Sequence, residues 1–283
     1  MLKKQIIVLT LFLLSFCMLM QAQSDDTVVQ KFEIRSHTFQ NTTLPYRIFI
    51  PENYDSSKSY PLLLCLHGAG ERGSDNEIQI SKHALATAWA KQEVQQKYPS
   101  IIIAPQCPKK RKWSYTDFGG GSYKIDSVSI GKEMLTVVNL IDTVLEEFNI
   151  DENRQYVTGI SMGGYGTWDI ISRYPERFAA AAPMSGAGDP SKVALFKNLP
   201  IWNFHNKSDK IVPVSGSHEM LTAMKSIGLN VVETLGMSNK KIKKKINKRA
   251  IHIYTENPEG NHGPWEQWCG STNLHNWMFL QSR

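Results

Sequence analysis

The sequence has few cysteines, and none of them lie close together. Its four cysteines are Cys17, Cys65, Cys107 and Cys269. A disulfide-rich scaffold or a zinc site needs cysteines at short spacing, so the sequence excludes both. It also has no histidine pair at helical ligand spacing, and we expect neither a metal ion nor a cofactor. At most one disulfide bond is possible after residue 22, and pairing of Cys107 with Cys269 is left open.

Long apolar runs are absent except for one at the N-terminus. Lys3 and Lys4 precede an apolar run over residues 6–20, and Gln21-Ala22-Gln23 follows it. This order is typical of a secretory signal peptide, and the run is short for a membrane span. Phe16 is bulky where a lipid attachment site at Cys17 would need a small residue. We expect a signal peptide over residues 1–22 and an exported protein, periplasmic or extracellular.

Excess charge of one sign is confined to one segment. The formal net charge of the 283 residues is +6. Removing the seven basic residues of segment 240–249, which has no acidic residue, leaves −1 for the rest of the chain. A nucleic-acid partner is therefore not expected. The cluster predicts a solvated basic loop or hairpin, with contact to an anionic surface as the alternative. Its lysines are Lys240, Lys241, Lys243, Lys244, Lys245 and Lys248.

The chain after residue 22 alternates apolar runs with segments of helical periodicity. Residues 28–39 and 44–50 flank a Gln40-Asn41-Thr42 turn, which predicts an antiparallel hairpin at a sheet edge. Buried strands are expected at 62–66, 101–104, 156–160, 178–183, 201–205 and 250–255, and helices at 80–97, 130–148, 165–172 and 217–227. With no repeat and no long linker, residues 23–283 are predicted to form one α/β domain. Its central sheet is mostly parallel, with helices on both faces.

One strand leads directly into a turn rich in glycine that holds a serine. Gly159-Ile160-Ser161-Met162-Gly163 follows an apolar run and precedes a helical segment. A sharp strand-to-helix turn holds a serine exposed, in a strained backbone conformation, where a base can activate it. The two glycines are needed because side chains there would collide across the turn. Ser161 is therefore the predicted nucleophile.

A serine nucleophile needs a histidine base and a carboxylate that orients the histidine. In a parallel sheet these groups lie just beyond the carboxyl ends of strands. Asp209 follows the strand that ends at His205, and His262 follows the last strand. We predict Asp209 as the acid, with Asp189 as the second candidate, and His262 as the base. His218 is the weaker candidate for the base.

Hydrolysis also needs donors for a developing oxyanion and a surface for the substrate. The turn after strand 62–66 can present backbone amides there, and we expect the amides of Ala69 and Met162 to do so. His67 is expected to be structural. Gln106 is a candidate polar contact, and Trp113 and Trp265 are candidates for stacking on a substrate ring.

Five motifs occur in order along the chain. They are Leu66-His67-Gly68-Ala69-Gly70-Glu71-Arg72-Gly73, Ala104-Pro105-Gln106-Cys107-Pro108, Gly159-Ile160-Ser161-Met162-Gly163-Gly164, Val212-Pro213-Val214 and Pro258-Glu259-Gly260-Asn261-His262. Together they resemble the α/β-hydrolase superfamily, and more narrowly its secreted esterase and predicted-peptidase group, which includes polyhydroxybutyrate-depolymerase-like and feruloyl-esterase-like enzymes. The resemblance implies Ser161, Asp209 and His262 as the triad and residues 67–69 as the oxyanion loop. The chain departs from it at Asn206, where a glycine is usual, and at 233–249, which resembles an insertion.

We therefore predict a secreted serine carboxylic-ester hydrolase that acts through an acyl-enzyme. Acyl or feruloyl esters of plant polysaccharide are its expected substrates. A serine peptidase of the prolyl-oligopeptidase type would use the same triad and is the nearest alternative. A carbohydrate-binding or surface-binding protein that has kept the fold without the chemistry is the alternative from another class.

Overall fold

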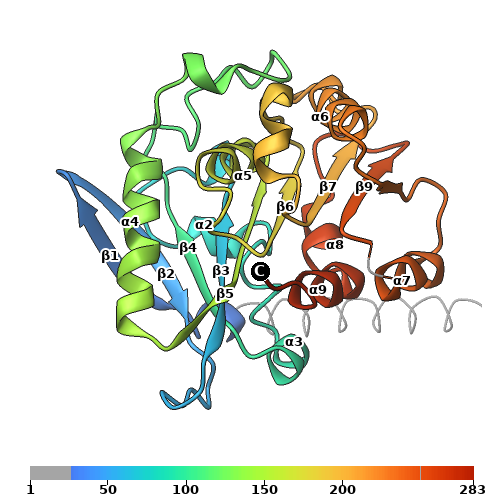
Figure 1. The fold of residues 1–283 in the computed structure, drawn as a ribbon. Helices are drawn as coiled ribbons and strands as arrows, with labels where there is room; N and C mark the ends of the chain where they lie inside the picture. The colour runs from blue at the N-terminus through green and yellow to red at the C-terminus, as the bar shows by residue number, and fades with distance from the viewer. Residues whose placement is uncertain (1–26, 249) are drawn as a thin grey trace, which may run out of the picture.

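The computed structural model describes residues 27–248 and 250–283, which share one nine-stranded sheet (Figure 1). The predicted signal peptide, with Cys17, lies outside the described residues, as does Arg249. The sheet order is β1-β2-β4-β3-β5-β6-β7-β9-β8. β1 and β2 form an antiparallel hairpin, β2 pairs antiparallel with β4, and all other pairs are parallel. The predicted α/β architecture is confirmed.

The strands and helices alternate along the chain after the hairpin. The strands are β1 (Glu33–Phe39), β2 (Thr42–Phe49), β3 (Tyr60–Leu66), β4 (Ile101–Pro105), β5 (Ile150–Ile160), β6 (Ala180–Met184), β7 (Ile201–Asn206), β8 (Val231–Glu233) and β9 (His252–Asn257). The helices are α2 (Ile78–Ser81), α3 (Gln92–Lys97), α4 (Lys132–Glu147), α5 (Met162–Arg173), α6 (Ser215–Ser226), α7 (Asn239–Asn247), α8 (Trp265–Cys269) and α9 (Thr272–Phe279), with short 3₁₀ turns at Ala69–Glu71, Ile125–Ser127 and Pro190–Phe196.

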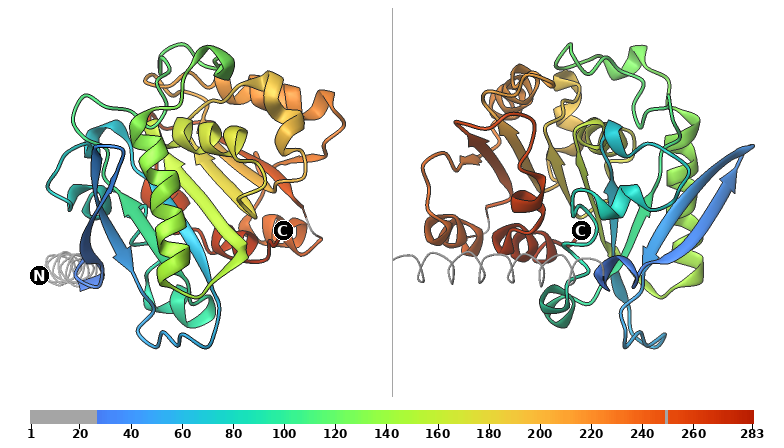
Figure 2. Two further views of the ribbon diagram at one scale, coloured as in Figure 1. Left: turned by 60° about the vertical axis from the view of Figure 1, so that its left-hand side comes forward. Right: turned by 180° about the vertical axis from the view of Figure 1, so that it is seen from behind.

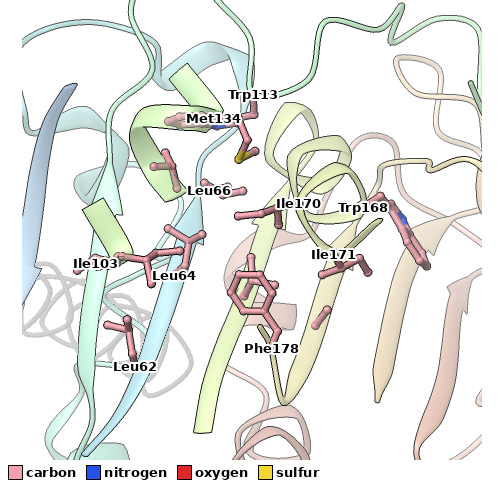
Figure 3. Packing of buried hydrophobic residues seen from close by; sticks show 14 of the residues in the cluster. Leu62, Leu64, Leu66, Ile103, Trp113, Met134, Trp168, Ile170, Ile171 and Phe178 are labelled. Atoms are coloured by element: carbon pink, nitrogen blue, oxygen red, sulfur yellow. The ribbon is translucent and has the colours of Figure 1, made fainter. Parts of the chain in front are cut away.

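Both faces of the sheet are covered at its central strands β3, β4, β6 and β7, whose residues are all buried, which explains why these strands lack polar alternation. Successive residues of a strand point to opposite faces, so Leu62, Leu64 and Leu66 enter one core and Leu63 and Cys65 the other. The first core lies under α4, α5 and α6, and part of it is drawn in Figure 3. The second lies under the segment 80–90 and helices α8 and α9. Each large apolar side chain buried there stabilises the fold by about 2 kcal/mol.

Two predicted elements differ from the structure. The helix expected at 80–97 is wrong, because only the short helices α2 and α3 form at its ends. Between them Ala84 has a positive φ of 51°, and the stretch buries Leu85, Ala88 and Trp89 together. The positive φ at Ala84 interrupts helical geometry, and the segment packs against the sheet as an irregular chain. The first hairpin strand also begins at Glu33, later than residue 28.

The basic segment forms a helix instead of the predicted loop or hairpin. β8 adds a short parallel strand outside β9, and α7 connects the two (Figure 1). The hairpin β1–β2 therefore stands at one edge of the sheet and the β8–α7 unit at the other, as the views in Figure 2 also show. No helix of residues 27–248 or 250–283 has the length and apolar character needed to cross a bilayer.

The three cysteines among the described residues are free and buried. Cys107 belongs to the first core, whereas Cys65 and Cys269 belong to the second. Cys107 and Cys269 therefore do not pair, because the sheet lies between them.

Candidate active site

The turn between β5 and α5 holds Ser161 in a strained backbone conformation. Its φ of 54° and ψ of −116° lie outside the regions that L-residues ordinarily occupy. The turn is tight enough to require its glycines: a Cβ on Gly163 would lie 1.7 Å from the carbonyl oxygen of Leu66, and one on Gly159 would lie 2.2 Å from that of Gly163. Ser161 N also donates to Met184 O at 2.8 Å, which fixes the turn to β6.

The structure brings Ser161, His262 and Asp209 into one hydrogen-bonded chain. His262 Nε2 lies 2.7 Å from Ser161 Oγ, and His262 Nδ1 lies 2.7 Å from Asp209 Oδ2. An ionised carboxylate only accepts, so Nδ1 carries the ring proton and Nε2 is free to accept the proton of the serine hydroxyl. The three residues come from the loops after β5, β9 and β7, which lie at the carboxyl edge of the parallel strands.

The carboxylate of Asp209 is buried but extensively hydrogen-bonded. Oδ1 accepts from the backbone N–H groups of Ile211 and Val212, each at 2.9 Å. Oδ2 accepts from His262 and lies 3.4 Å from Nε2 of the buried His205. Burial alone would raise the pKa of Asp209, but the hydrogen bonds from His205, His262 and the two amides outweigh it and hold the pKa well below its ordinary value. Asp209 is therefore an anion throughout the neutral range.

Asn206, at the end of β7, connects the acid loop to the histidine loop. Its side-chain Nδ2 donates to the carbonyl oxygens of Asn261, at 2.7 Å, and Gly263, the residues on either side of His262. Ser208 Oγ donates to Gly260 O in the same region. The sequence marks Asn206 only as a departure from the usual glycine, and its contact with the histidine loop depends on folding together segments far apart in the chain.

The two candidate oxyanion donors are backbone amides, and each belongs to the first residue of a helical element near Ser161. Met162 is the first residue of α5, and Ala69 is the first residue of the 3₁₀ turn after β3. Amides in the first turn of a helix have no intrahelical acceptor. The two loops also lie close together, because a Cβ on Gly68 would stand 3.6 Å from that of Ser161. Both amides are thus candidates to bind an oxyanion formed at Ser161.

His67 braces the oxyanion turn from below, as expected for a structural residue. Its Nε2 accepts from Cys107 N at 2.8 Å, and its Nδ1 lies 2.6 Å from Gly68 O. Burial lowers the pKa of His67 to about 4, against smaller opposing contributions, so the ring is neutral at pH 7.

Two predicted substrate contacts are wrong because their side chains are completely buried. Trp113 packs in the first core beside Met134 (Figure 3), and its Nε1 donates to His67 O at 3.0 Å. Gln106 Oε1 accepts from Asn76 N at 2.7 Å, and its Nε2 donates to Glu71 O at 3.2 Å. Both side chains hold the oxyanion turn and leave no surface for a substrate.

Trp265 lies against the proposed base. Its ring meets that of His262 edge to face, with centroids 5.0 Å apart and an interplanar angle of 90°. Only 6% of Trp265 is exposed, and its ring also packs against that of Trp268, with centroids 5.7 Å apart. Its binding of a substrate stays a prediction.

The weaker candidates for acid and base have other partners. Asp189 caps the 3₁₀ turn Pro190–Phe196 by accepting from Ser191 N, and it also accepts from Ile125 N at 2.9 Å. His218 Nε2 lies 2.5 Å from Glu256 Oε2. Within residues 27–248 and 250–283, no group of three or more His, Cys, Asp or Glu residues could hold a metal ion.

Comparison with known proteins shows which family the chain belongs to. The family model Esterase, described as "Putative esterase", matches residues 36–272. The chain belongs to this esterase family. A crystal structure described as a thermostable esterase superposes with a TM-score of 0.77 at 35% identity, covering 91% of this chain and 64% of that one. A feruloyl esterase module from Clostridium thermocellum superposes with a TM-score of 0.60 at 14% identity, over 89% of this chain and 91% of that one, which shows the shared α/β-hydrolase fold.

The curated relatives are matched over only part of their own length. The bifunctional acetylxylan esterase/xylanase XynS20E of Neocallimastix patriciarum is 27% identical over 58% of this chain and 21% of its own length. A probable feruloyl esterase C of Aspergillus terreus is 25% identical over 62% of this chain and 58% of its own length. The chain thus matches well under two thirds of the length of these relatives.

Proposed function

We propose that this protein is a serine carboxylic-ester hydrolase with Ser161 as nucleophile, His262 as base and Asp209 as acid. The observation that carries the proposal is the continuous chain of short contacts from Ser161 Oγ through His262 to Asp209. A carboxylate–imidazole–hydroxyl chain at the apex of a strained strand-to-helix turn is the arrangement that activates serine for acyl transfer. Membership of the esterase family supports an ester as the substrate.

Each residue of the chain has a step in the proposed reaction. His262 Nε2 takes the proton of Ser161 as Oγ attacks the ester carbonyl carbon, and the carboxylate of Asp209 stabilises the imidazolium that forms. The amides of Ala69 and Met162 bind the tetrahedral oxyanion. On collapse, His262 donates its proton to the leaving alcohol and an acyl-enzyme remains on Ser161. Water, activated by His262, then attacks the acyl carbon and releases the acid.

We further propose acetyl or feruloyl esters of plant polysaccharide as the substrates of an exported enzyme. The names of two relatives, an acetylxylan esterase/xylanase and a probable feruloyl esterase, support this class. Another relative, from Arthroderma benhamiae, is named as a secreted protein, in keeping with the signal peptide proposed for residues 1–22. A prolyl-oligopeptidase-type peptidase stays the nearest alternative, because the same triad cleaves amides.

Hydrolysis of p-nitrophenyl acetate by the wild-type protein and Ser161→Ala tests the mechanism. We expect the variant to lose at least about 10⁴-fold in kcat/KM, since it lacks the nucleophile. Ser185→Ala is the matched control: Ser185 also follows a strand with a positive φ, of 46°, but it is fully buried. Activity that survives in Ser161→Ala would contradict the assignment.

A substrate panel then separates the ester from the peptide alternative. We expect release of ferulate from ethyl ferulate or of acetate from acetylated xylan, and no cleavage of peptide p-nitroanilides. Peptide cleavage without ester cleavage would favour the peptidase. Binding of xylan with no turnover of any ester would favour a non-catalytic protein.

A further inference from the structure

Helix α7 carries its charge and its apolar residues on opposite sides. Ile246 is only 4% exposed, and Ile242 packs against the same second core, so this side faces the body of the protein. The lysines occupy the rest of the helix surface, as a spacing of 3.6 residues per turn requires. In Figure 1, α7 lies beside α9 at the sheet edge that carries β8 and β9. The exposed lysines, here called the basic face, are Lys240, Lys241, Lys243, Lys244 and Lys245.

The basic face does not stabilise its own helix. Among the described residues, no acidic side chain forms an ion pair with any of these lysines. Lys240 and Lys244, and likewise Lys241 and Lys245, stand four residues apart, and like charges at this spacing destabilise a helix. Lys240 and Lys241 also lie in the first turn, where the helix dipole disfavours cations. A bound polyanion would attract each lysine and so offset the repulsion between them.

Other contacts hold the helix in place despite this repulsion. Ser238 caps its N-terminus by accepting from Lys241 N, and Asn273 Nδ2 of α9 donates to Asn239 O at 3.2 Å. Trp277 Nε1 of α9 donates to Ala250 O at 2.9 Å, just after the helix. The lysines are therefore presented on a fixed support.

A hollow of about 480 Å³ opens beside the N-terminus of α7. Its walls come from the segment after β8, the end of β9, α8 and the start of α9. Many of its side chains are neutral hydrogen-bonding groups, among them Asn239, Asn257, Gln267 and Thr272. Glu256 also lines it, with its carboxylate bound to His218 and to Tyr254 Oη at 2.8 Å. Neutral amides and hydroxyls of this kind suit a ligand rich in hydroxyl groups.

The hollow adjoins the loop that carries the proposed base. Asn257 and Pro258 line it, and the same loop continues to His262. On the other side, Gln267 and Trp268 line it two and three residues after Trp265, whose ring contacts His262. A chain-like ligand seated in the hollow would therefore lie next to the proposed active site.

We propose that the basic face of α7 and the adjoining hollow bind an anionic polysaccharide, one that carries uronic acid carboxylates. The lysines would pair with carboxylates of the chain while hydroxyl groups of the adjoining sugars bind in the hollow. That this glycan also carries the ester rests on the proposed function. A polysaccharide is favoured over a membrane because the apolar side of α7 is buried against the core, whereas a membrane-surface helix inserts its apolar face into the lipid.

Binding of sodium polygalacturonate tests the proposal. The test variant replaces all five lysines of the basic face by glutamine. The control variant also removes five positive charges, far from α7 in the sequence, by the same substitution at Lys31, Lys58, Lys124, Lys132 and Lys192. We expect the full protein to bind, more weakly as salt rises, and the test variant to bind at least about tenfold more weakly than the control variant. Neutral arabinoxylan should bind far less than polygalacturonate.

A second variant keeps the result interpretable. Removing mutually repelling charges should leave the thermal unfolding midpoint of the test variant unchanged or higher. If that variant unfolds at a lower temperature, Gln267→Ala, which alters the wall of the hollow alone, takes its place, with an expected severalfold loss. Equal losses in the test and control variants, or no binding by the wild-type protein, would overturn the proposal. Binding to phosphatidylglycerol vesicles with none to polygalacturonate would overturn it in favour of a membrane contact.

Hydrolysis of p-nitrophenyl acetate, measured on the same preparations, keeps this inference separate from the proposed function. Polygalacturonate binding by a wild-type protein without esterase activity would refute the proposed function and leave the binding site standing. Esterase activity without polygalacturonate binding would refute the binding site alone.

Discussion

The two loops that meet at the active site are held in place in different ways. The turn at Ser161 is fixed by backbone packing, since a Cβ on Gly163 would lie 1.7 Å from Leu66 O and the serine amide donates to β6. The loop at His262 is held by side chains of the acid loop, chiefly Asn206 and Ser208. The histidine loop contains Gly260 and Gly263, both with positive φ, and only 18% of the His262 side chain is exposed.

This difference separates stability from activity. A side chain added at the glycines of the serine turn would collide with the backbone that joins β3, β5 and β6, and should therefore lower the stability of the fold. A change in the contacts of the histidine loop leaves the core intact, and should show in the rate of reaction instead.

Among changes to the contacts of the histidine loop, Asp209→Asn is expected to lower the rate of reaction most. The amide cannot stabilise the imidazolium and favours the wrong ring tautomer, so we expect kcat to fall on the order of 10⁴-fold. The exposed Asp126, which pairs with Lys192, provides Asp126→Asn as the control. Hydrolysis of p-nitrophenyl acetate gives kcat for both variants. An Asp209→Asn protein within tenfold of wild type would remove Asp209 from the mechanism.

At the serine turn, Gly163→Ala should act on folding. The added methyl group has no space beside Leu66, and the expected loss in the free energy of unfolding is about 3 kcal/mol or more. In Gly119→Ala the new methyl would meet only Asp117 Oδ1, at 3.7 Å, and should change little. Urea unfolding followed by circular dichroism compares the two. Equal stabilities would contradict a turn fixed by packing.

Acid should weaken the support beneath the serine turn. Burial lowers the pKa of His67 to about 4, whereas an unfolded histidine titrates near 6.5. Between these values the unfolded chain binds more protons, so stability falls as the pH drops, by about 3 kcal/mol at most from this residue. Burial also lowers the pKa of His275 to about 4.

Unfolding free energies measured in urea from pH 7 to pH 4.5 test this pH dependence. His275→Gln should flatten the curve, because one of the buried groups no longer titrates. A wild-type stability that stays constant over this range would contradict the neutral, buried state of these histidines.

A smaller effect than that of Asp209→Asn is expected from Asn206→Gly, which removes both hydrogen bonds to the carbonyl oxygens beside His262. A small displacement of the base should lower kcat by about tenfold and leave KM for a small ester nearly unchanged. Ser208→Ala, which removes a single bond to Gly260, should have a weaker effect. A kcat for Asn206→Gly equal to that of wild type would show that the histidine loop keeps its position without the hydrogen bonds from Asn206.

The sequence predicts the serine turn better than it predicts the side-chain contacts around the site. The serine turn follows from a short pattern, because backbone sterics impose it locally. Asp209 and His262 are predicted from their places just beyond the ends of strands, and the order of strands and helices from the alternation of apolar runs with helical periodicity. The burial of Trp113 and Gln106 does not follow from such patterns, since both come from a loop whose path depends on the packing of α4 and the oxyanion turn. The link from Asn206 to the histidine loop joins residues more than fifty positions apart, which no local pattern reveals.

The basic segment illustrates the other limit. A loop or hairpin is predicted for this segment because its run of lysines shows no obvious apolar side. Ile242 and Ile246, four residues apart, are the signal that the segment forms a helix packed against α9.

Labelling with an alkyl fluorophosphonate, followed by intact-mass measurement and peptide mapping, tests the central claim most directly. If Ser161 is the nucleophile activated by His262, the protein gains one adduct, on Ser161, as ester hydrolysis disappears. His262→Ala should then label far more slowly, and Ser161→Ala not at all. An inactivating adduct on another residue, or hydrolysis that persists while Ser161 is fully labelled, would contradict the account.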